Sequence, residues 1–246
     1  MSVGDDGWSI TQVTPPAGWW VPVATSVFAL AASATAVLPR VLWSRHVTVG
    51  LNLLNVVSTV GHEAGHALAS CLTGGGVWVI QVYTPDSGVT HLWHPSRLSS
   101  IVTSMAGYAL PPLAGLGAAT LLARGHAPML LALTVAAMLL ILVVTRDRIT
   151  LASVVAIGVV AGASLYWGPV WLQQWIAYGE TWLLLFGEAF GVLVIALNRV
   201  RRGFTDRSDD AADLARATHI PSLVWLAAWL ALSGWVLWIA IPMLWP

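Results

Sequence analysis

The sequence predicts an all-α polytopic membrane protein with about six or seven transmembrane helices and one small β-hairpin. Of the 246 residues, 57% are hydrophobic and 9% are charged, and the mean hydropathy is +0.77. Apolar runs long enough to cross a bilayer alternate with short polar segments. A β-rich stretch between two of these runs supplies the hairpin.

The chain divides into a polar tail and one membrane domain. Residues 1–19 are expected to form a flexible tail, and residues 20–246 are expected to form a single domain. Within this domain we expect a first span at residues 20–38 and a second at 47–72, which ends at three consecutive glycines. The β-hairpin is expected at residues 77–93, where two β-rich runs flank a turn.

The rest of the chain supplies the remaining spans. A third span, kinked by two consecutive prolines, is followed by two shorter apolar spans. The next apolar stretch is expected to divide at Glu180 into an interfacial segment and a sixth span. An acidic loop and a last, tryptophan-rich span complete the domain. These elements are predicted at residues 98–122, 129–144, 149–166, 171–197, 199–217 and 221–244.

One stretch in the second span carries the chemistry, His62-Glu63-Ala64-Gly65-His66. On a helix, the i, i+4 spacing places both imidazoles on one face, where they can bind one zinc ion, and Glu63 lies beside them. In this arrangement Glu63 would take a proton from a zinc-bound water and deliver it to the leaving amine. Ionisable groups at bilayer depth are costly, which favours a functional site over a chance match.

Polar residues recur along the same helix at intervals of three or four. This spacing draws one polar stripe down an apolar cylinder. We therefore expect the stripe to face the interior of the helix bundle. Its members are Asn52, Asn55, Thr59, His62, His66 and Ser70.

We predict that Asp210 supplies the third metal ligand. Zinc bound by two neutral imidazoles keeps its full positive charge, so a carboxylate is favoured over a third imidazole. Ser208 or Asp209 can cap a helix that begins at about Asp210 and runs into the last span. Asp209 and Asp213 are the alternatives.

The hairpin directly follows the metal-binding helix. Because its open edges cannot face lipid, we expect it in the membrane interface or in a protein-lined cavity beside the metal. An edge of this kind can hold an extended substrate as an added strand, and we predict that Val79 and Val82 bind substrate in this way. His91 and His94 at its exit are interpreted as residues of a solvated loop, with a second metal site as the alternative.

Composition and charge limit the partners. The formal net charge is zero and lysine is absent, so no nucleic-acid partner is expected, and the lipid bilayer is the surrounding medium. The sequence leaves the oligomeric state open. Arginines concentrate in the loops that a cytoplasmic N-terminus and seven spans would place inside. That orientation sets the active site nearer the cytoplasmic face, and the composition points to a bacterial plasma membrane.

The chain resembles the site-2 protease family of intramembrane zinc metalloproteases, in particular its compact bacterial branch without a PDZ insert. The resemblance implies that the two motif histidines and a distant aspartate bind zinc and that Glu63 activates water. In the family the distant aspartate usually precedes glycine, whereas Ala211 follows Asp210 here. The features that carry the resemblance are His62 to Ala67 in a membrane helix, the glycine-rich β segment after it, Gly107-Tyr108 with Pro111 in the next helix, and Asp209-Asp210 before the last span.

The sequence thus predicts an intramembrane zinc endopeptidase that hydrolyses peptide bonds of membrane-embedded proteins or peptides through a zinc-activated water. A non-enzymatic membrane metal transporter or sensor is one alternative, and it would repeat its ligands along several helices. A catalytically silent, protease-like adaptor is the other, and it would have no distant aspartate at the metal.

Overall fold

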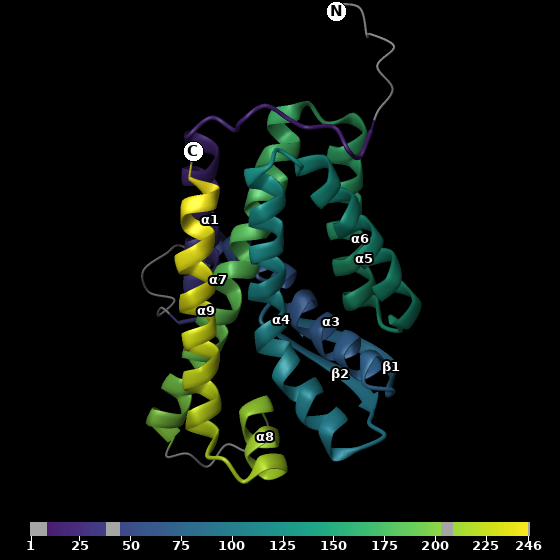
Figure 1. The fold of residues 1–246 in the computed structure, drawn as a ribbon, viewed down its shortest axis with the longest axis vertical. Helices are drawn as coiled ribbons and strands as arrows, with labels where there is room; N and C mark the ends of the chain where they lie inside the picture. The colour runs from purple at the N-terminus through teal and green to yellow at the C-terminus, as the bar shows by residue number, and fades with distance from the viewer. Residues whose placement is uncertain (1–8, 38–44, 203–208, 246) are drawn as a thin grey trace, which may run out of the picture.

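A computed structural model describes residues 9–37, 45–202 and 209–245 of the chain. Figure 1 shows an upright bundle of helices with a two-stranded sheet low on one side. Five of the described helices are long and apolar enough to cross a membrane, and the apolar helix α1 is shorter. The predicted all-α polytopic membrane fold with one small hairpin is therefore confirmed.

The described elements follow one another with short connections. In chain order they are α1 (Trp20–Ala34), α2 (Arg45–Leu54), α3 (Val56–Leu72), β1 (Gly76–Thr84), β2 (Ser87–Trp93), α4 (Arg97–Ala123), α5 (Ala127–Val144), α6 (Arg148–Trp167), α7 (Val170–Arg202), α8 (Asp210–Thr218) and α9 (Ser222–Leu244).

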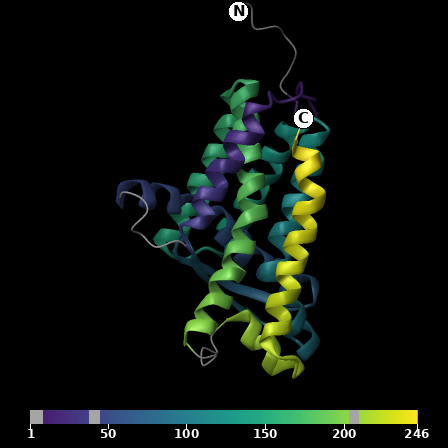
Figure 2. The ribbon, with the colours of Figure 1, turned by 90° about the vertical axis from the view of Figure 1, so that its left-hand side faces the viewer.

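Helix α7 is the centre of the bundle, because it packs against α1, α4 and α9, while α5 and α6 pair beside it (Figures 1 and 2). The largest core lies between these helices and includes Leu131, Trp182 and Val236, each at most 1% exposed. Large apolar side chains such as Leu140 and Trp238 are exposed on the outside, as expected for helices surrounded by lipid.

The motif helix differs from the prediction, because residues 47–72 form two helices instead of one. Asn55 separates α2 from α3. Its side-chain amide donates to the carbonyl of Ala32 at 3.1 Å and to the carboxylate of Asp86 at 2.7 Å. Asn55, at the break between the two helices, therefore connects the end of α1 to the tip of the hairpin. Helix α2 points away from the bundle (Figure 2).

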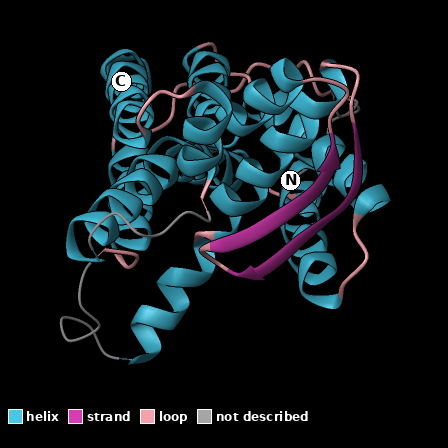
Figure 3. Cartoon of the chain, turned by 90° about the horizontal axis from the view of Figure 1, so that it is seen from below, coloured by secondary structure: helices cyan, strands magenta, loops and turns pink. Residues whose placement is uncertain are grey.

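The two strands pair in an antiparallel hairpin across Pro85 and Asp86, and the hairpin lies across the lower face of the bundle (Figure 3). The outer edge of β1 is covered by the junction of α5 and α6. Ile80 forms a parallel bridge with Thr145, and the N–H of Val82 donates to Oγ1 of Thr150 at 2.7 Å. In this part of the structure, the unpaired strand edge is that of β2.

Two further predictions are corrected. Residues 171–197 belong to one continuous helix, α7, with no break at Glu180. The carboxylate of Glu180 accepts a hydrogen bond from the hydroxyl of Thr134 in α5. This hydrogen bond offsets the cost of burying the carboxylate, so the helix continues through Glu180. Helix α8 does not run into the last span, because His219 adopts the left-handed conformation (φ 63°) and Pro221 precedes α9.

The hairpin and α8 share one end of the bundle, as the sequence predicts for two segments that meet at a metal. Residues 9–18 and the end of α9 lie at the opposite end (Figure 1). The two ends of the described chain are therefore on one side, which differs from the predicted seven-span orientation, where they are on opposite sides.

Helix α4 continues across Pro111 and Pro112 without interruption.

Candidate metal centre and active site

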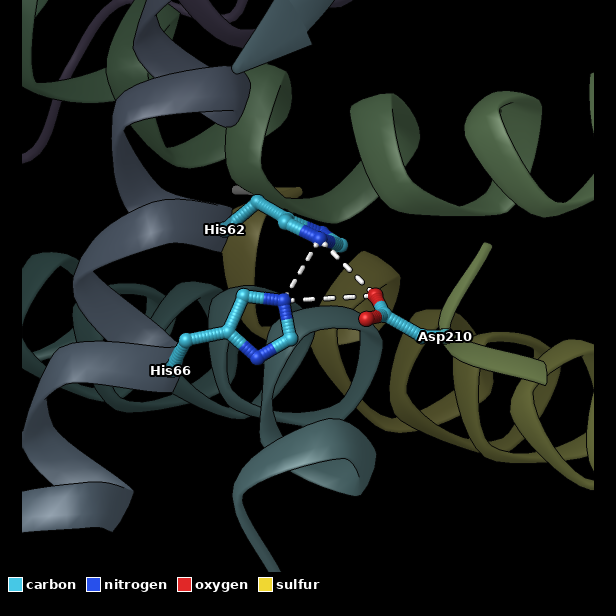
Figure 4. A group of neighbouring side chains, drawn as sticks. All are labelled: His62, His66 and Asp210. Carbon is cyan, nitrogen blue, oxygen red and sulfur yellow. Dashed lines mark hydrogen bonds and ion pairs between the residues drawn. The ribbon is translucent and has the colours of Figure 1, made fainter. Parts of the chain in front are cut away.

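Helix α3 presents two imidazoles to a carboxylate from α8. The Nε2 atoms of His62 and His66 lie 3.0 Å apart, and each lies 3.2 Å from Oδ2 of Asp210 (Figure 4). Among the described residues, these three side chains form the one group of histidine and acidic residues whose ligand atoms lie close enough to hold a metal ion. The structure therefore brings together the two histidines and the aspartate that the sequence singles out.

The donor set fits zinc. Zinc takes nitrogen and oxygen ligands at about 2.0–2.2 Å in a tetrahedral arrangement, so its ligand atoms lie about 3.3 Å apart. The separations of 3.0 and 3.2 Å agree with this value. Two imidazoles and one carboxylate leave a fourth position open, which is the pattern of a catalytic zinc site.

Asp210 reaches the histidines because the first turn of α8 is anchored. Asp209 caps this helix, since its Oδ1 accepts the N–H of Ala212 at 2.9 Å. Both Asp209 oxygens also accept from Arg199 of α7, at 2.5 and 2.7 Å. Arg199 is 4% exposed and donates to Ser222 at the start of α9 as well. One guanidinium nitrogen of Arg199 thus contacts both oxygens of Asp209. These charge-assisted hydrogen bonds fix Asp209, and so they fix the first turn of α8, which carries Asp210.

The surroundings of Asp210 favour its ionised form. Burial opposes ionisation and raises the pKa, but the attraction and hydrogen bonds of His66 and His62 outweigh burial and hold the pKa of Asp210 well below its ordinary value. Of the two alternatives, Asp209 is engaged by Arg199. Asp213 is half-exposed and pairs with Arg216. It lies outside the group of His62, His66 and Asp210, which is called the metal-binding group below.

Each histidine has a partner for its other ring nitrogen. Nδ1 of His66 donates to the carbonyl of Thr103 at 2.7 Å, and a carbonyl can only accept, so Nε2 of His66 is free to act as a ligand. Nδ1 of His62 lies 3.2 Å from Oε2 of Glu188 in α7. The sequence predicts that Glu188, which has Gly187 before it and Gly191 three residues after it, is a carboxyl satisfied by a neighbouring helix. An ionisable residue in an apolar run is nevertheless a signal of function.

Helix α4 closes the site from behind. The ring of Tyr108 meets the ring of His62 edge-on, with centroids 4.4 Å apart. At the preceding residue, Gly107, a Cβ atom would lie 2.5 Å from Nε2 of His66 and 2.7 Å from Cε1 of His62. Because no side chain fits there, Gly107 allows the helix backbone to pass directly beside both imidazoles.

Glu63 points to the hairpin. Its residue is 4% exposed, and its Oε2 accepts the hydroxyl of Thr90 in β2 at 2.6 Å. Other members of the polar stripe also contact the hairpin: Thr59 donates to the carbonyl of Pro85 at 2.5 Å, and Ser70 donates to that of Trp93 at 3.3 Å. The stripe thus faces protein, with the hairpin as a main partner.

A cavity of about 710 Å³ opens beside the candidate ligands and Glu63. It is lined by residues 86–92 of the hairpin turn and β2, and by residues of α1, α3, α4, α7 and α8. Val79 and Val82 are not among the lining residues, and the amide of Val82 is already bonded to Thr150. The edge predicted to bind substrate at Val79 and Val82 is therefore covered, because β1 is the strand that packs on α5 and α6.

The hairpin histidines do not join the metal-binding group. Nε2 of His91 lies 3.2 Å from Oε1 of Gln81. His94 lines the cavity, and partial burial together with repulsion from His66 lowers the pKa of its imidazole. His94 follows the hairpin, whereas His91 lies within β2 and pairs with Val79, so its expected loop position is corrected. A second metal site has no third ligand among the described residues.

Comparison with known proteins identifies the family. A sequence model of the family described as Peptidase M50B-like matches residues 27–240. Neither the curated proteins nor the solved structures contain a match. The matched region runs from α1 into α9, so it includes all three residues of the metal-binding group and Glu63.

The geometry separates Asp210 from Asp213. Removing only a hydrogen-bond partner of a ligand typically weakens metal binding by about 10–100-fold. Asp210→Asn changes a ligand itself, so we expect it to weaken zinc binding by more than about 100-fold. Asp213→Asn, three residues further on the same helix, should bind zinc as the unmodified protein does. Chelator competition with purified protein measures both affinities. Equal affinities in the two variants would contradict the assignment of Asp210.

Proposed function

The chain belongs to the Peptidase M50B-like family, and on this premise we propose that it is an intramembrane zinc endopeptidase acting on membrane-embedded proteins or peptides. The observation that carries the proposal is the convergence of His62, His66 and Asp210 at a cavity that Glu63 also lines. When bound there, zinc supplies Lewis-acid activation of water.

The residues of this chain have separate tasks in the proposed reaction. His62 and His66 offer their Nε2 atoms, and Asp210 offers a carboxylate oxygen. Glu63 acts as the general base that accepts a proton from the attacking water and delivers it to the leaving amine. The hydroxyl of Thr90 holds Oε2 of Glu63, so the carboxylate keeps a defined orientation toward the cavity.

Substrate presentation is proposed to use the free edge of β2. A helical substrate hides its carbonyl groups, so it must become extended before cleavage, and an unpaired strand can hold it by backbone hydrogen bonds. Val82 pairs with Gly88 and Ile80 with Thr90. Because the amide of Val82 points away from β2 to Thr150, the alternation of an antiparallel ladder directs the backbone groups of Gly88 and Thr90 away from β1.

This arrangement moves the proposed substrate-binding strand from β1 to β2. Thr90 contacts Glu63 through its side chain and offers its backbone to the open edge. A substrate strand added there would run beside the general base, with the metal-binding group in the same cavity.

The orientation proposed for the membrane follows the arginines. Arg97, Arg146, Arg148 and Arg199 occur at the ends of helices on the hairpin side of the bundle, whereas Arg124 lies at the opposite end, in the turn between α4 and α5. Positive charge is enriched on the cytoplasmic side. The active site would therefore open nearer the cytoplasmic face of a bacterial plasma membrane.

The proposed mechanism is tested by Glu63→Gln. The amide keeps the size of the side chain and can still accept from Thr90, but it cannot take up a proton at neutral pH. The variant should bind zinc with unchanged stoichiometry. Its rate of cleavage of a co-expressed membrane substrate should fall by about 10²–10⁴-fold, which is the contribution typical of a general base. Retained cleavage would refute the mechanism. Zinc binding by the unmodified protein without cleavage would favour the silent adaptor.

Cross-linking tests the substrate-binding strand. In a Glu63→Gln, Cys71→Ala background, a cysteine at Val89 of β2 should form disulfides with cysteines placed along a membrane substrate. A cysteine at Val79 of β1 is the matched control and should form few. Alternate substrate positions should react best, because side chains of an added strand alternate between two faces. Preferential reaction at residue 79 would place the substrate on the other strand.

Labelling of single cysteines in whole cells tests the orientation. A cysteine at Arg216 in α8 should resist a membrane-impermeant reagent until the cells are opened, because this helix lies at the proposed cytoplasmic end. A cysteine at Arg124, at the opposite end, should react in intact cells. The reverse pattern would contradict the proposed orientation.

A further inference from the structure

We propose that Glu188 is the positioning residue and the countercharge of the metal centre, acting through His62. This inference rests on the proposed zinc site but concerns a residue outside its ligand set. Glu188 lies on α7, is 4% exposed, and has its Oε2 atom 3.2 Å from Nδ1 of His62.

The contact fixes which ring nitrogen of His62 is available to a metal. The ring bridges two carboxylates, with Nδ1 toward Glu188 and Nε2 toward Asp210. A proton on Nδ1 that is donated to Glu188 leaves the Nε2 lone pair free. A carboxylate in this position also makes the imidazole a stronger ligand.

The fold brings Glu188 to this place by a close approach of two helices. A Cβ atom at Gly187 would collide with the side chain of Ser58 in α3, so only glycine lets α7 come this near. Tyr108 packs on the ring of His62 from α4. His62 is therefore held between an aromatic ring and a buried carboxylate, which restricts its rotation.

Charge balance gives Glu188 a second task. Zinc with two neutral imidazoles and the Asp210 carboxylate retains one positive charge, and a buried, uncompensated charge is costly. The other imidazole, His66, bonds to the neutral carbonyl of Thr103. Glu63 is a second carboxylate in the same cavity, but it bonds to Thr90 of the hairpin. Glu188 instead contacts an imidazole of the proposed site directly, so its negative charge acts on the metal through His62.

A second carboxyl on the same helix provides a matched comparison. Glu180 also lies inside an apolar stretch of α7, but its carboxylate bonds to Thr134 of α5 and does not line the cavity beside the histidines. A general effect of removing a buried charge from α7 should appear at both positions. An effect that passes through His62 should appear only at Glu188.

Zinc affinity, measured by chelator competition on the full-length protein in detergent, tests the inference without any need for cleavage. Glu188→Gln keeps the size of the side chain and an acceptor oxygen but removes the charge, and it should weaken zinc binding by 10–100-fold. Glu188→Asp, which keeps the charge, should retain more affinity than Glu188→Gln. Glu180→Gln should bind zinc as the unmodified protein does.

The outcomes separate this inference from the proposed function. If the unmodified protein binds zinc and cleaves substrate while Glu188→Gln shows unchanged affinity, the role of Glu188 is refuted and the proposed function stands. Equal losses at Glu188→Gln and Glu180→Gln would also overturn it. If Glu188→Gln does not fold, Glu188→Asp is the deciding variant. A zinc affinity equal to that of the unmodified protein would support the role of the negative charge. A loss of zinc affinity beyond about 100-fold would contradict it. A protein that binds no zinc would overturn both proposals.

Discussion

Ionisable side chains inside this helix bundle must be paired, because an unpaired charge in an apolar interior costs several kcal/mol. This constraint accounts for the arrangement of the site. His62 lies between two carboxylates, and Arg199 is joined to Asp209 by two hydrogen bonds. The contacts of His62 link α3 to α7 and α8, which are distant in sequence, and the Arg199–Asp209 pair joins the consecutive helices α7 and α8. The pairing of charges therefore also determines how α3, α7 and α8 pack around the cavity.

The hairpin obeys a related constraint on backbone groups. A strand edge in contact with lipid would leave N–H and C=O groups without partners. The edge of β1 meets this requirement through Thr145 and Thr150 at the junction of α5 and α6. The edge of β2 borders the cavity instead, where water or an extended peptide can bond to it. The two strands therefore differ in what their outer edges contact, although both are β-rich runs of the same hairpin.

The sequence predicts those features that depend on local pattern. The apolar runs, the hairpin and the spacing of His62 and His66 follow from hydropathy and periodicity. The charge of zinc favours an acidic third ligand, and the capping pattern selects Asp210 over Asp209 and Asp213. Features that depend on distant partners were not predictable. Asn55 interrupts a helix because Ala32 and Asp86 accept from it, and Glu180 remains within one because Thr134 donates to it. The same holds for the edge of β1, since Thr150 lies far along the chain from Val82.

The position of Asp210 in the chain has a consequence for biosynthesis. Its two partner histidines belong to α3, whereas Asp210 begins α8, and the anchor of that helix includes Arg199 from α7 and Ser222 from α9. A nascent chain that has inserted α1 to α6 holds only two of the three ligands. The complete group of His62, His66 and Asp210 forms only after α7, α8 and α9 have been synthesised and have docked. Synthesis therefore delays assembly of the site until the surrounding bundle exists to enclose it.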